Sequence, residues 1–283
     1  LIIERHDNLS KIIDSGVDVI VAGISSIGIE WFANEISKFC KNKTSIILLT
    51  KGLAVEDDQL ITLSEKLENI LKKNGHKSAN ISSVKGPCLA TGLAHKMRTG
   101  TVIANQNLNQ AQKIQKLIST EYYKSEITDD ISGVEFSAAI KNIYSMLIGA
   151  AEGLSNPSAP AEIQEKFYLN TSASLVHRSI SEMVEFVSYY SGRVETVYGL
   201  AGLGDLHVSV AGGRNSLMGK YLGQGYLYKD AKENFMKEIT VEGAQLAFEI
   251  EPKIMKNFKE KQFPLMFSIL KCICYNKKLE INW

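Results

Sequence analysis

The chain has 283 residues, of which 45% are hydrophobic, and its 32 Lys and Arg nearly balance its 31 Asp and Glu. This composition is typical of a globular protein with a sizeable core, and a net charge of +1 lacks the basic excess of a nucleic-acid-binding protein. No apolar run approaches the roughly 20 residues that span a bilayer, so membrane insertion is not expected. At about 150 residues per domain, the length predicts two domains.

The chain starts with LIIERHDN, at Leu1 rather than at Met, and we expect residues upstream of it to be missing. This start lacks the charged and then apolar layout of a signal peptide. The four cysteines are few and are not spaced as a disulfide framework, which favours a reducing compartment. Cys272 and Cys274 have one residue between them and no second ligand pair nearby. We therefore expect no metal site and interpret both as buried apolar side chains.

The first 130 residues alternate between short apolar runs and amphipathic segments. The runs read as buried strands of a parallel sheet, at 17–24, 45–49, 80–84 and 101–104. Helical periodicity marks the segments 28–39, 58–73 and 108–118, and a last edge strand is expected at 122–127. This alternation predicts an α/β doubly wound, Rossmann-like sheet, which we assign to a dinucleotide-binding domain over residues 1–130.

After about Ile131 the pattern changes to helices. Apolar residues recur at helical spacing over 134–147 and 173–187, and no convincing strand follows Gly133. The stretch SNPSAP at 155–160 is expected to break the chain between helices. We therefore predict an all-α substrate and catalytic domain over residues 131–283.

The glycine motifs that bind phosphates are absent in their usual form. A dinucleotide site should carry G-x-G-x-x-G after its first strand, but GLAGLG at 199–204 has its glycines in the wrong order. GISSIG at 23–28 has the glycine spacing of a P-loop but continues with Ile-Glu instead of Lys and a hydroxyl residue. Gly23 and Ser25 still lie just past a strand end, where they form either a ligand contact or an ordinary turn.

Two further loops follow predicted strands. Lys51, in the sequence TKG, comes directly after the strand at 45–49, so it either faces the ligand crevice or lies in solvent. The sequence GPC follows the strand at 80–84. Its glycine, Gly86, allows a backbone to approach a ligand closely, and a plain loop is the alternative.

Lys141 and Asn142 form a more informative pair because they lie inside an apolar helical segment. A buried, unpaired ammonium group is costly, so this lysine either reaches solvent or has a partner and a function. A partly buried lysine with a lowered pKa is a competent general acid or base near neutral pH. We favour the functional interpretation because small residues surround the pair.

The stretch GLAGLGDLHVSVAGGRN at 199–215 combines flexibility with polar chemistry. Arg214 offers a planar fork suited to a phosphate group. Neutral donors that suit the same ligand are Ser209, Gly212, Gly213 and Asn215. Asp205 should face a hydroxyl or a lysine instead, and His207 is more simply a surface or structural histidine. A glycine-rich connection between helices is the alternative for the whole stretch.

Taken in order, these stretches resemble the NAD-dependent glycerol-3-phosphate dehydrogenases. The resemblance runs from about residue 17 to beyond 243, and each motif is weak alone while the ordered set is specific. The matching stretches are TKG at 50–52, GPCLA at 86–90, GVEFSAAIKN at 133–142, YGLAGLGDL at 198–206, GGRN at 212–215 and VEG at 241–243. The resemblance implies a cytoplasmic, homodimeric enzyme that interconverts sn-glycerol 3-phosphate and dihydroxyacetone phosphate with NAD or NADP.

The resemblance also implies a role for each matching position. Lys141 becomes the catalytic residue that exchanges a proton with the oxygen on C2, Asp205 orients it, and Lys51 lies near the reacting centre. The positions implied for the substrate are Lys51, Gly86, Asn142, Asp205, Ser209, Gly213, Arg214 and Asn215. The residues expected to contact the cofactor include the two at the end of the first strand. The full set is Gly23, Ser25, Lys51, Cys88, Ala90, Arg214 and Glu242.

The chain departs from the family pattern in several places. Cys88 stands where Ser, Thr or Asn is usual, Gly92 where Glu is expected, and Ser209 where Thr is usual. The largest departure concerns the first βαβ unit with its glycine-rich turn, which we expect before Leu1, so that the sheet is truncated. The residue that selects NAD or NADP belongs to that unit, and cofactor affinity depends on it.

Two other functions remain open. One is a related β-hydroxyacid-type dehydrogenase, which the sequence GGRN and the Lys141–Asn142 pair argue against. The other is a non-catalytic, truncated relative that acts as a binding module. The joint presence of Lys141, Asp205, Arg214 and Asn215 argues against that second alternative.

Overall fold

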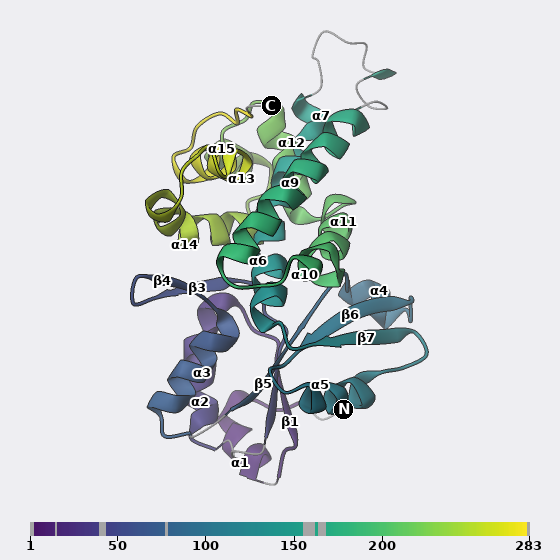
Figure 1. Ribbon diagram of the computed structural model, residues 1–283, viewed down its shortest axis with the longest axis vertical. Helices are drawn as coiled ribbons and strands as arrows, with labels where there is room; N and C mark the ends of the chain where they lie inside the picture. Colours follow the sequence, from purple (N-terminus) through teal and green to yellow (C-terminus); the bar gives the residue numbers. More distant parts are fainter. Residues whose placement is uncertain are drawn as a thin grey trace.

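The computed structural model describes residues 3–14, 16–39, 44–76, 79–154, 162–163 and 168–281. A sheet-containing part and a helical part meet where the long helix α6 (Ile131–Gly149) leaves the sheet and enters the helical part (Figure 1). Within the described residues, no helix has both the length and the apolar character needed to cross a membrane.

Five strands form the main sheet, in the order β1-β2-β5-β6-β7. Their bounds are Val19–Ala22, Ser45–Leu48, Asn80–Lys85, Thr99–Ala104 and Tyr123–Thr128. Strands β1, β2 and β5 are parallel to one another, β6 runs antiparallel to β5, and β7 is parallel to β6. Every strand predicted from the sequence is present.

The expectation of a wholly parallel sheet is wrong at β6. The connection from β5 to β6 contains the five-residue helix α4 (Ala90–Ala94), whereas a parallel crossover usually contains a longer helix. The chain therefore enters β6 beside the end of β5, with Lys85 paired to Val102.

Helices cover both faces of the sheet. Side chains alternate along β2, so Ile46 and Leu48 pack with α2 (Ile29–Ser37) and α3 (Leu63–Lys73). Ile47 points to the opposite face, where it joins the core under α5 (Leu108–Ile118). The prediction of a doubly wound, Rossmann-like fold is confirmed by this arrangement. Three short helices complete this part, η1 (His6–Asn8), α1 (Leu9–Asp14) and η2 (Ser26–Gly28).

A hairpin replaces the start of the helix predicted over 58–73. Strands β3 (Leu53–Glu56) and β4 (Gln59–Thr62) pair antiparallel, and α3 begins only at Leu63. The turn residues Asp57 and Asp58 adopt φ values of 48° and 63°, in the left-handed region that aspartate tolerates better than most residues. Leu53 and Leu60 then join the buried core of the helical part, which stabilises the hairpin.

The second part of the molecule is helical, and from residue 131 onward the described residues contain no strand. After α6 the helices are α7 (Ala151–Leu154), α9 (Leu169–Tyr189), α10 (Val194–Tyr198), the π-helical turn η3 (Leu200–Gly204), α11 (Asp205–Val210), α12 (Arg214–Gly223), α13 (Tyr228–Phe235), α14 (Glu242–Asn257) and α15 (Pro264–Cys274). The predicted break at 155–160 lies outside the described residues.

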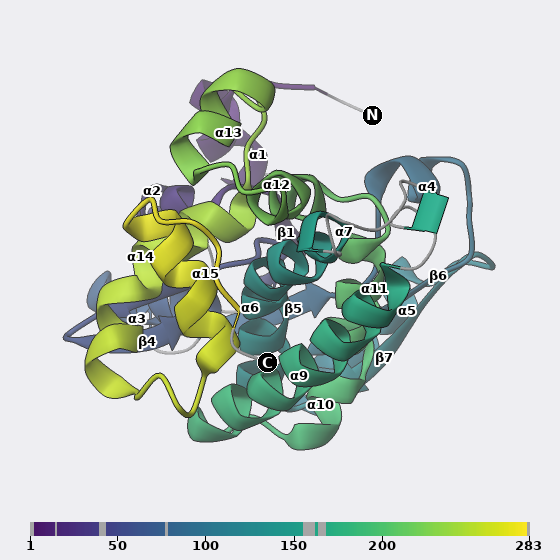
Figure 2. The same ribbon diagram turned by 90° about the horizontal axis from the view of Figure 1, so that it is seen from above.

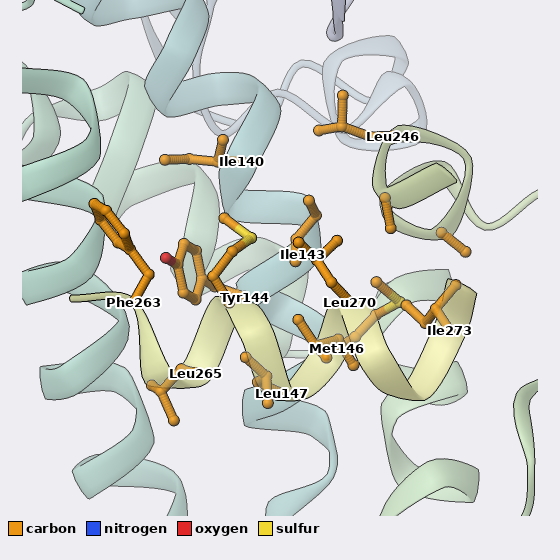
Figure 3. Packing of buried hydrophobic residues seen from close by; sticks show 14 of the residues in the cluster. Ile140, Ile143, Tyr144, Met146, Leu147, Leu246, Phe263, Leu265, Leu270 and Ile273 are labelled. Atoms are coloured by element: carbon orange, nitrogen blue, oxygen red, sulfur yellow. The ribbon is translucent and has the colours of Figure 1, made fainter. Parts of the chain in front are cut away.

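Helix α6 lies in the middle of the helical part, with α9, α11, α12, α14 and α15 around it (Figure 2). Its residues from Gly133 to Ile148 are all buried, because other helices pack around it. Tyr144 and Leu147 of α6 face the side chains of α15 in the core (Figure 3). A rigid central helix of this kind fixes the polar groups that it carries.

Helix α12 packs unusually close to α6. The two helices run parallel, with Met146 beside Gly219 and Ala150 beside Gly223. A Cβ atom on Gly219 would lie 1.9 Å from the carbonyl oxygen of Met146, so only glycine allows this approach. The first residues of α12 are thereby held next to the middle of α6.

Candidate active site

A cavity of about 570 Å³ lies where the carboxyl ends of β2 and β5 meet the helical part. Its wall on the sheet side includes Lys51, Cys88 and Ala90. Its wall on the helical side contains most of the polar residues singled out from the sequence: Lys141, Asn142, Asp205, Ser209, Gly213, Arg214, Asn215 and Glu242. The structure thus gathers residues that are up to 191 positions apart, from Lys51 to Glu242, around one space.

Asp205 joins two lysines in this cavity. Its Oδ1 accepts a hydrogen bond from Nζ of Lys141 at 2.9 Å, and its Oδ2 accepts one from Nζ of Lys51 at 2.5 Å. Asp205 is the first residue of α11, directly after the π-helical turn η3, and its side chain is buried. Asp205 thus directly follows a π-helical turn, a feature that is frequent at functional sites.

Lys141 also donates a hydrogen bond to Oγ of Ser209 at 2.5 Å. The residue is only 3% exposed, so its ammonium group has little contact with solvent. The pKa of Lys141 is lowered to about 8, first by burial and then by the positive charge of Lys51, while Asp205 acts in the opposite direction. Lys141 can therefore hold or release a proton close to neutral pH.

Helices α6, α12 and α14 meet at one end of the cavity, around Asn215. Nδ2 of Asn215 donates to Oδ1 of Asn142 at 3.1 Å, and Oδ1 of Asn215 accepts a hydrogen bond from the backbone N–H of Gly243 at 2.9 Å. This side chain ties the start of α12 to α6 and to α14. The position of Arg214 next to it is therefore well defined.

Arg214 is the first residue of α12 and pairs with Glu242, the first residue of α14, through Nη2 and Oε1 at 2.8 Å. Both side chains are about half exposed, so the pair faces open space in the cavity. The residue before α12, Gly213, provides no side-chain cap for the first turn of the helix. An uncapped amino terminus beside a guanidinium group suits an anion such as phosphate.

The loop after β5 forms the wall on the sheet side. Gly86 has a φ of 132°, and a Cβ atom there would lie 3.1 Å from Cα of Thr101, so this sharp turn requires glycine. Gly86 itself is buried and, unlike Cys88 and Ala90, is not part of the cavity wall. Cys88 is partly buried at the cavity wall, and burial raises the pKa of its thiol.

Gly23 and Ser25 are placed differently from the other predicted site residues. Both are exposed and follow β1, as the sequence predicted, but neither is part of the cavity wall. A Cβ atom on Gly23 would meet no atom within 4 Å, so no close backbone approach explains this glycine. His207, interpreted from the sequence as a surface or structural residue, is exposed and does line the cavity.

Two buried charged residues near the site were not predicted. Lys85 is the last residue of β5 and is 2% exposed, and Glu135 lies in the first turns of α6 with 2% exposure. Lys85 directly precedes the sequence GPC, and Glu135 lies within GVEFSAAIKN. Both stretches were singled out from the sequence for other residues. The sequence gives no signal that Lys85 is buried, because a lysine at the end of a strand usually reaches solvent.

Comparisons with known proteins agree with this geometry. The carboxyl-terminal model of the NAD-dependent glycerol-3-phosphate dehydrogenase family matches residues 130–281, and the amino-terminal model of that family matches residues 3–111. The NADP(+)-dependent glycerol-3-phosphate dehydrogenase of Archaeoglobus fulgidus is 29% identical over 279 residues, which cover 97% of this chain and 78% of that protein. The glycerol-3-phosphate dehydrogenase [NAD(P)+] of Clostridium botulinum is 29% identical over 255 residues, 89% of this chain and 71% of that protein.

A solved structure leads to the same group of proteins. The crystal structure of glycerol-3-phosphate dehydrogenase from Coxiella burnetii superimposes with a TM-score of 0.78 at 26% identity, covering 93% of this chain and 75% of that one. The resemblance inferred from the short sequence motifs is thus confirmed by matches over both parts of the molecule. The chain belongs to the NAD-dependent glycerol-3-phosphate dehydrogenase family.

Proposed function

We propose that this protein catalyses the NAD- or NADP-dependent interconversion of sn-glycerol 3-phosphate and dihydroxyacetone phosphate. The observation that carries the proposal is that one cavity holds both a group able to move a proton and a group able to bind a phosphate. A buried lysine with a pKa of about 8 lies there, with Arg214 at an uncapped helix terminus. A phosphorylated alcohol and ketone pair needs both, a group that moves a proton and a group that binds a phosphate.

The residues present fit the reactive end of a nicotinamide cofactor. The cavity lies at the carboxyl edge of a doubly wound sheet, where such folds bind their ligands. Lys51, Cys88, Ala90, Arg214 and Glu242 are the residues that would contact the cofactor there. When bound, NAD or NADP exchanges a hydride with C2 of the substrate.

Lys141 handles the proton in this proposal. In the direction of oxidation its neutral amine accepts the proton of the C2 hydroxyl as the C2–O bond becomes a carbonyl, and the lysine becomes an ammonium group. In the direction of reduction the ammonium group returns the proton to the same oxygen. Asp205 holds the lysine through Oδ1, and Lys51 on Oδ2 adds positive charge that favours proton release.

Arg214 binds the substrate phosphate in this proposal. Its guanidinium group is paired with Glu242 in the cavity, so a phosphate competes with that carboxylate for Arg214. Polar groups around the same space that can bind or orient the rest of the substrate are Asn142, Ser209, Gly213 and Asn215. The turn at Gly86 leads into the opposite wall, on the sheet side, at Cys88 and Ala90.

We also propose a division of labour and an assembly that the family resemblance suggests. Residues 1–130 would form the dinucleotide-binding domain and residues 131–283 the substrate domain, which the change from strands to helices at Ile131 supports. The enzyme would work as a homodimer in the cytoplasm. Light scattering of the purified protein tests the dimer directly.

Replacement of Lys141 tests the proposed function. Lys141→Ala should lower kcat for dihydroxyacetone phosphate with NADH or NADPH by roughly 10²–10⁴-fold, because the proton donor is lost. Circular dichroism should show an unchanged fold. The matched control is Lys113→Ala, which removes an exposed lysine on α5 and should leave the rate unchanged. Near-normal turnover by a folded Lys141→Ala protein would overturn the mechanism.

A further inference from the structure

The ion pair of Arg214 with Glu242 occupies the group that the proposed function assigns to the substrate phosphate. Nη2 of Arg214 donates to Oε1 of Glu242 at 2.8 Å, and both residues line the active-site cavity. Only one nitrogen makes this contact, whereas a guanidinium group can bind a phosphate with two nitrogens at once. Within the described part of the chain Arg214 forms no other ion pair. The empty site therefore holds its phosphate-binding group in a contact that a better anion can replace.

The backbone beneath this ion pair does not depend on it. Oδ1 of Asn215 accepts the backbone N–H of Gly243 at 2.9 Å, so the residue after Arg214 is joined to the residue after Glu242. Gly243 also packs tightly on α6, because a Cβ atom there would lie 2.5 Å from the carbonyl oxygen of Asn142. Both Asn215 and Gly243 are buried. Arg214 and Glu242 can thus part by rotation of their side chains, while the starts of α12 and α14 stay together.

Stability of the fold does not account for the ion pair. Both side chains are about half exposed, and exposed ion pairs contribute little because water and salt screen them. An acidic residue in the first turn also suits the positive end of α14, but that role requires no arginine opposite it. What the ion pair does change is the site that an incoming anion meets, because the cation there is already paired with a carboxylate.

An anion that binds Arg214 meets two unfavourable effects at this end of the cavity. It must break the contact with Glu242, and it then lies near a carboxylate of the same sign. Free inorganic phosphate can offset these effects only with the contacts of the phosphate group itself. A phosphorylated alcohol also contacts the polar residues in the rest of the cavity. The ion pair therefore keeps weakly bound anions out of the site more effectively than it keeps out the substrate.

We propose that Glu242 is an internal competitor for Arg214, which lowers the occupancy of the substrate site by free inorganic phosphate. This inference rests on the proposed function of Arg214 and deepens it, because it adds a residue that opposes phosphate binding. In the empty site Glu242 holds the guanidinium group. When phosphate binds, the carboxylate turns away and the backbone of α12 and α14 remains in place.

The test measures the binding of inorganic phosphate to the full chain by ³¹P NMR at constant ionic strength. The protein is kept free of cofactor, because Glu242 is also among the residues that would contact the cofactor. Glu242→Gln keeps the size of the side chain and removes its charge, which weakens its hold on Arg214. The dissociation constant of phosphate should fall by roughly 3–10-fold, since the ion pair and the repulsion are both lost. An unchanged or weaker affinity in the folded variant would overturn the proposal.

A double-mutant cycle separates competition for Arg214 from simple repulsion by Glu242. Arg214→Ala should weaken phosphate binding, and in this background Glu242 has no guanidinium group to hold. Glu242→Gln should then improve the affinity by less than about 2-fold, or fail to restore binding at all. An equal gain in both backgrounds would show that Glu242 acts only as a like charge, and the proposed competition would be wrong.

The matched control is Glu152→Gln, which removes the same charge from another ion pair of α12. Glu152 pairs with Lys220 at 2.6 Å, both side chains are partly exposed, and neither is part of the active-site cavity wall. The dissociation constant of phosphate should stay within about 2-fold of that of the unaltered protein, because solvent and salt screen a charge outside the cavity. A gain as large as that of Glu242→Gln would assign the effect to the net charge of the protein and refute the proposal.

Phosphate binding keeps this test distinct from a test of the proposed function. If the unaltered protein binds phosphate through Arg214 but does not turn over dihydroxyacetone phosphate, the proposed function is wrong, and the cycle still decides the role of Glu242. If neither the unaltered protein nor Glu242→Gln binds phosphate, Arg214 is not a phosphate-binding group. The inference on Glu242 then fails as well, whatever the turnover.

Discussion

Lys141 is held where its two protonation states are close in free energy. Burial and the charge of Lys51 favour the neutral amine, and Asp205 favours the ammonium group. The outcome is a pKa of about 8 instead of the usual 10.5. A residue with this property can act as a base in one direction of a reaction and as an acid in the other.

The first prediction is therefore a pair of opposite pH profiles. Oxidation of sn-glycerol 3-phosphate should rise through about pH 8, because Lys141 must lose its proton before it can accept one. Reduction of dihydroxyacetone phosphate should fall over the same range, because the donor is then lost. Initial rates between pH 6 and pH 10 in both directions, with the constants separated into kcat and kcat/KM, measure these limbs. If the two limbs lie near pH 10.5 instead, the cavity does not lower the pKa of Lys141.

Sequence reasoning singled out individual residues where the chain itself supplied the contrast. Lys141 stands out because a charged residue interrupts an apolar helix, and Asp205 and Arg214 stand out among glycines. Lys85 does not, because a lysine at the end of a strand usually reaches solvent. Its burial follows from packing that includes the contact of α6 with β5, which joins residues distant in the chain.

Helices and strands were predicted correctly where residues within the element itself determine its bounds. Helix α5 has the predicted bounds, Leu108–Ile118, because its apolar positions and its cap at Asn107 all lie within the segment. The hairpin β3–β4 was missed because leucines from Leu60 onward recur at helical intervals through α3. Its stability comes from contact with α6 and α14, far along the chain.

The close packing of α12 on α6 gives a prediction at this scale. Gly219→Ala should lower the free energy of unfolding by about 2 kcal/mol or more, since the added Cβ would lie 1.9 Å from the carbonyl oxygen of Met146 and the helices must separate. Chemical denaturation measures the loss.

The control for this change is Gly92→Ala in α4. A Cβ atom at Gly92 would lie no closer than 3.9 Å to another atom, so the change should alter stability by at most about 1 kcal/mol. An equal effect of the two substitutions would mean that the contact between α12 and α6 is not as close as the structure indicates.

The whole molecule works only if its two parts keep a fixed relation, because each contributes one wall of the cavity. The link between Lys51 and Asp205 crosses from one part to the other, and α6 leaves the sheet to become the central helix. The sequence predicted both parts and their order. It could not predict the reversed direction of β6 or the contacts between the parts, because these depend on residues distant in the chain.

The hairpin β3–β4 makes a second link between the parts, and its charge gives the last prediction. Asp58 at the tip forms ion pairs with Lys253 and Lys256 of α14, and the side chain of Lys253 is only 10% exposed. Asp58→Asn keeps a residue that tolerates the left-handed turn, and it removes the charge. The melting temperature should fall by about 2–5 °C at low salt, because the nearly buried Lys253 loses its partner.

Two controls, high salt and a substitution at Asp57, distinguish the loss of the ion pairs from a change in the backbone of the turn. In 1 M NaCl the difference from the unaltered protein should shrink, since the Debye length falls to about 3 Å and the pair of Asp58 with Lys256, both more than half exposed, is screened. Asp57→Asn changes the other residue of the same turn, which forms no ion pair within the described part of the chain, and should leave the melting temperature unchanged. A loss of stability in Asp58→Asn that persists in high salt, or that Asp57→Asn reproduces, would place its origin in the backbone of the turn. The hairpin would then link the two parts through its buried leucines alone.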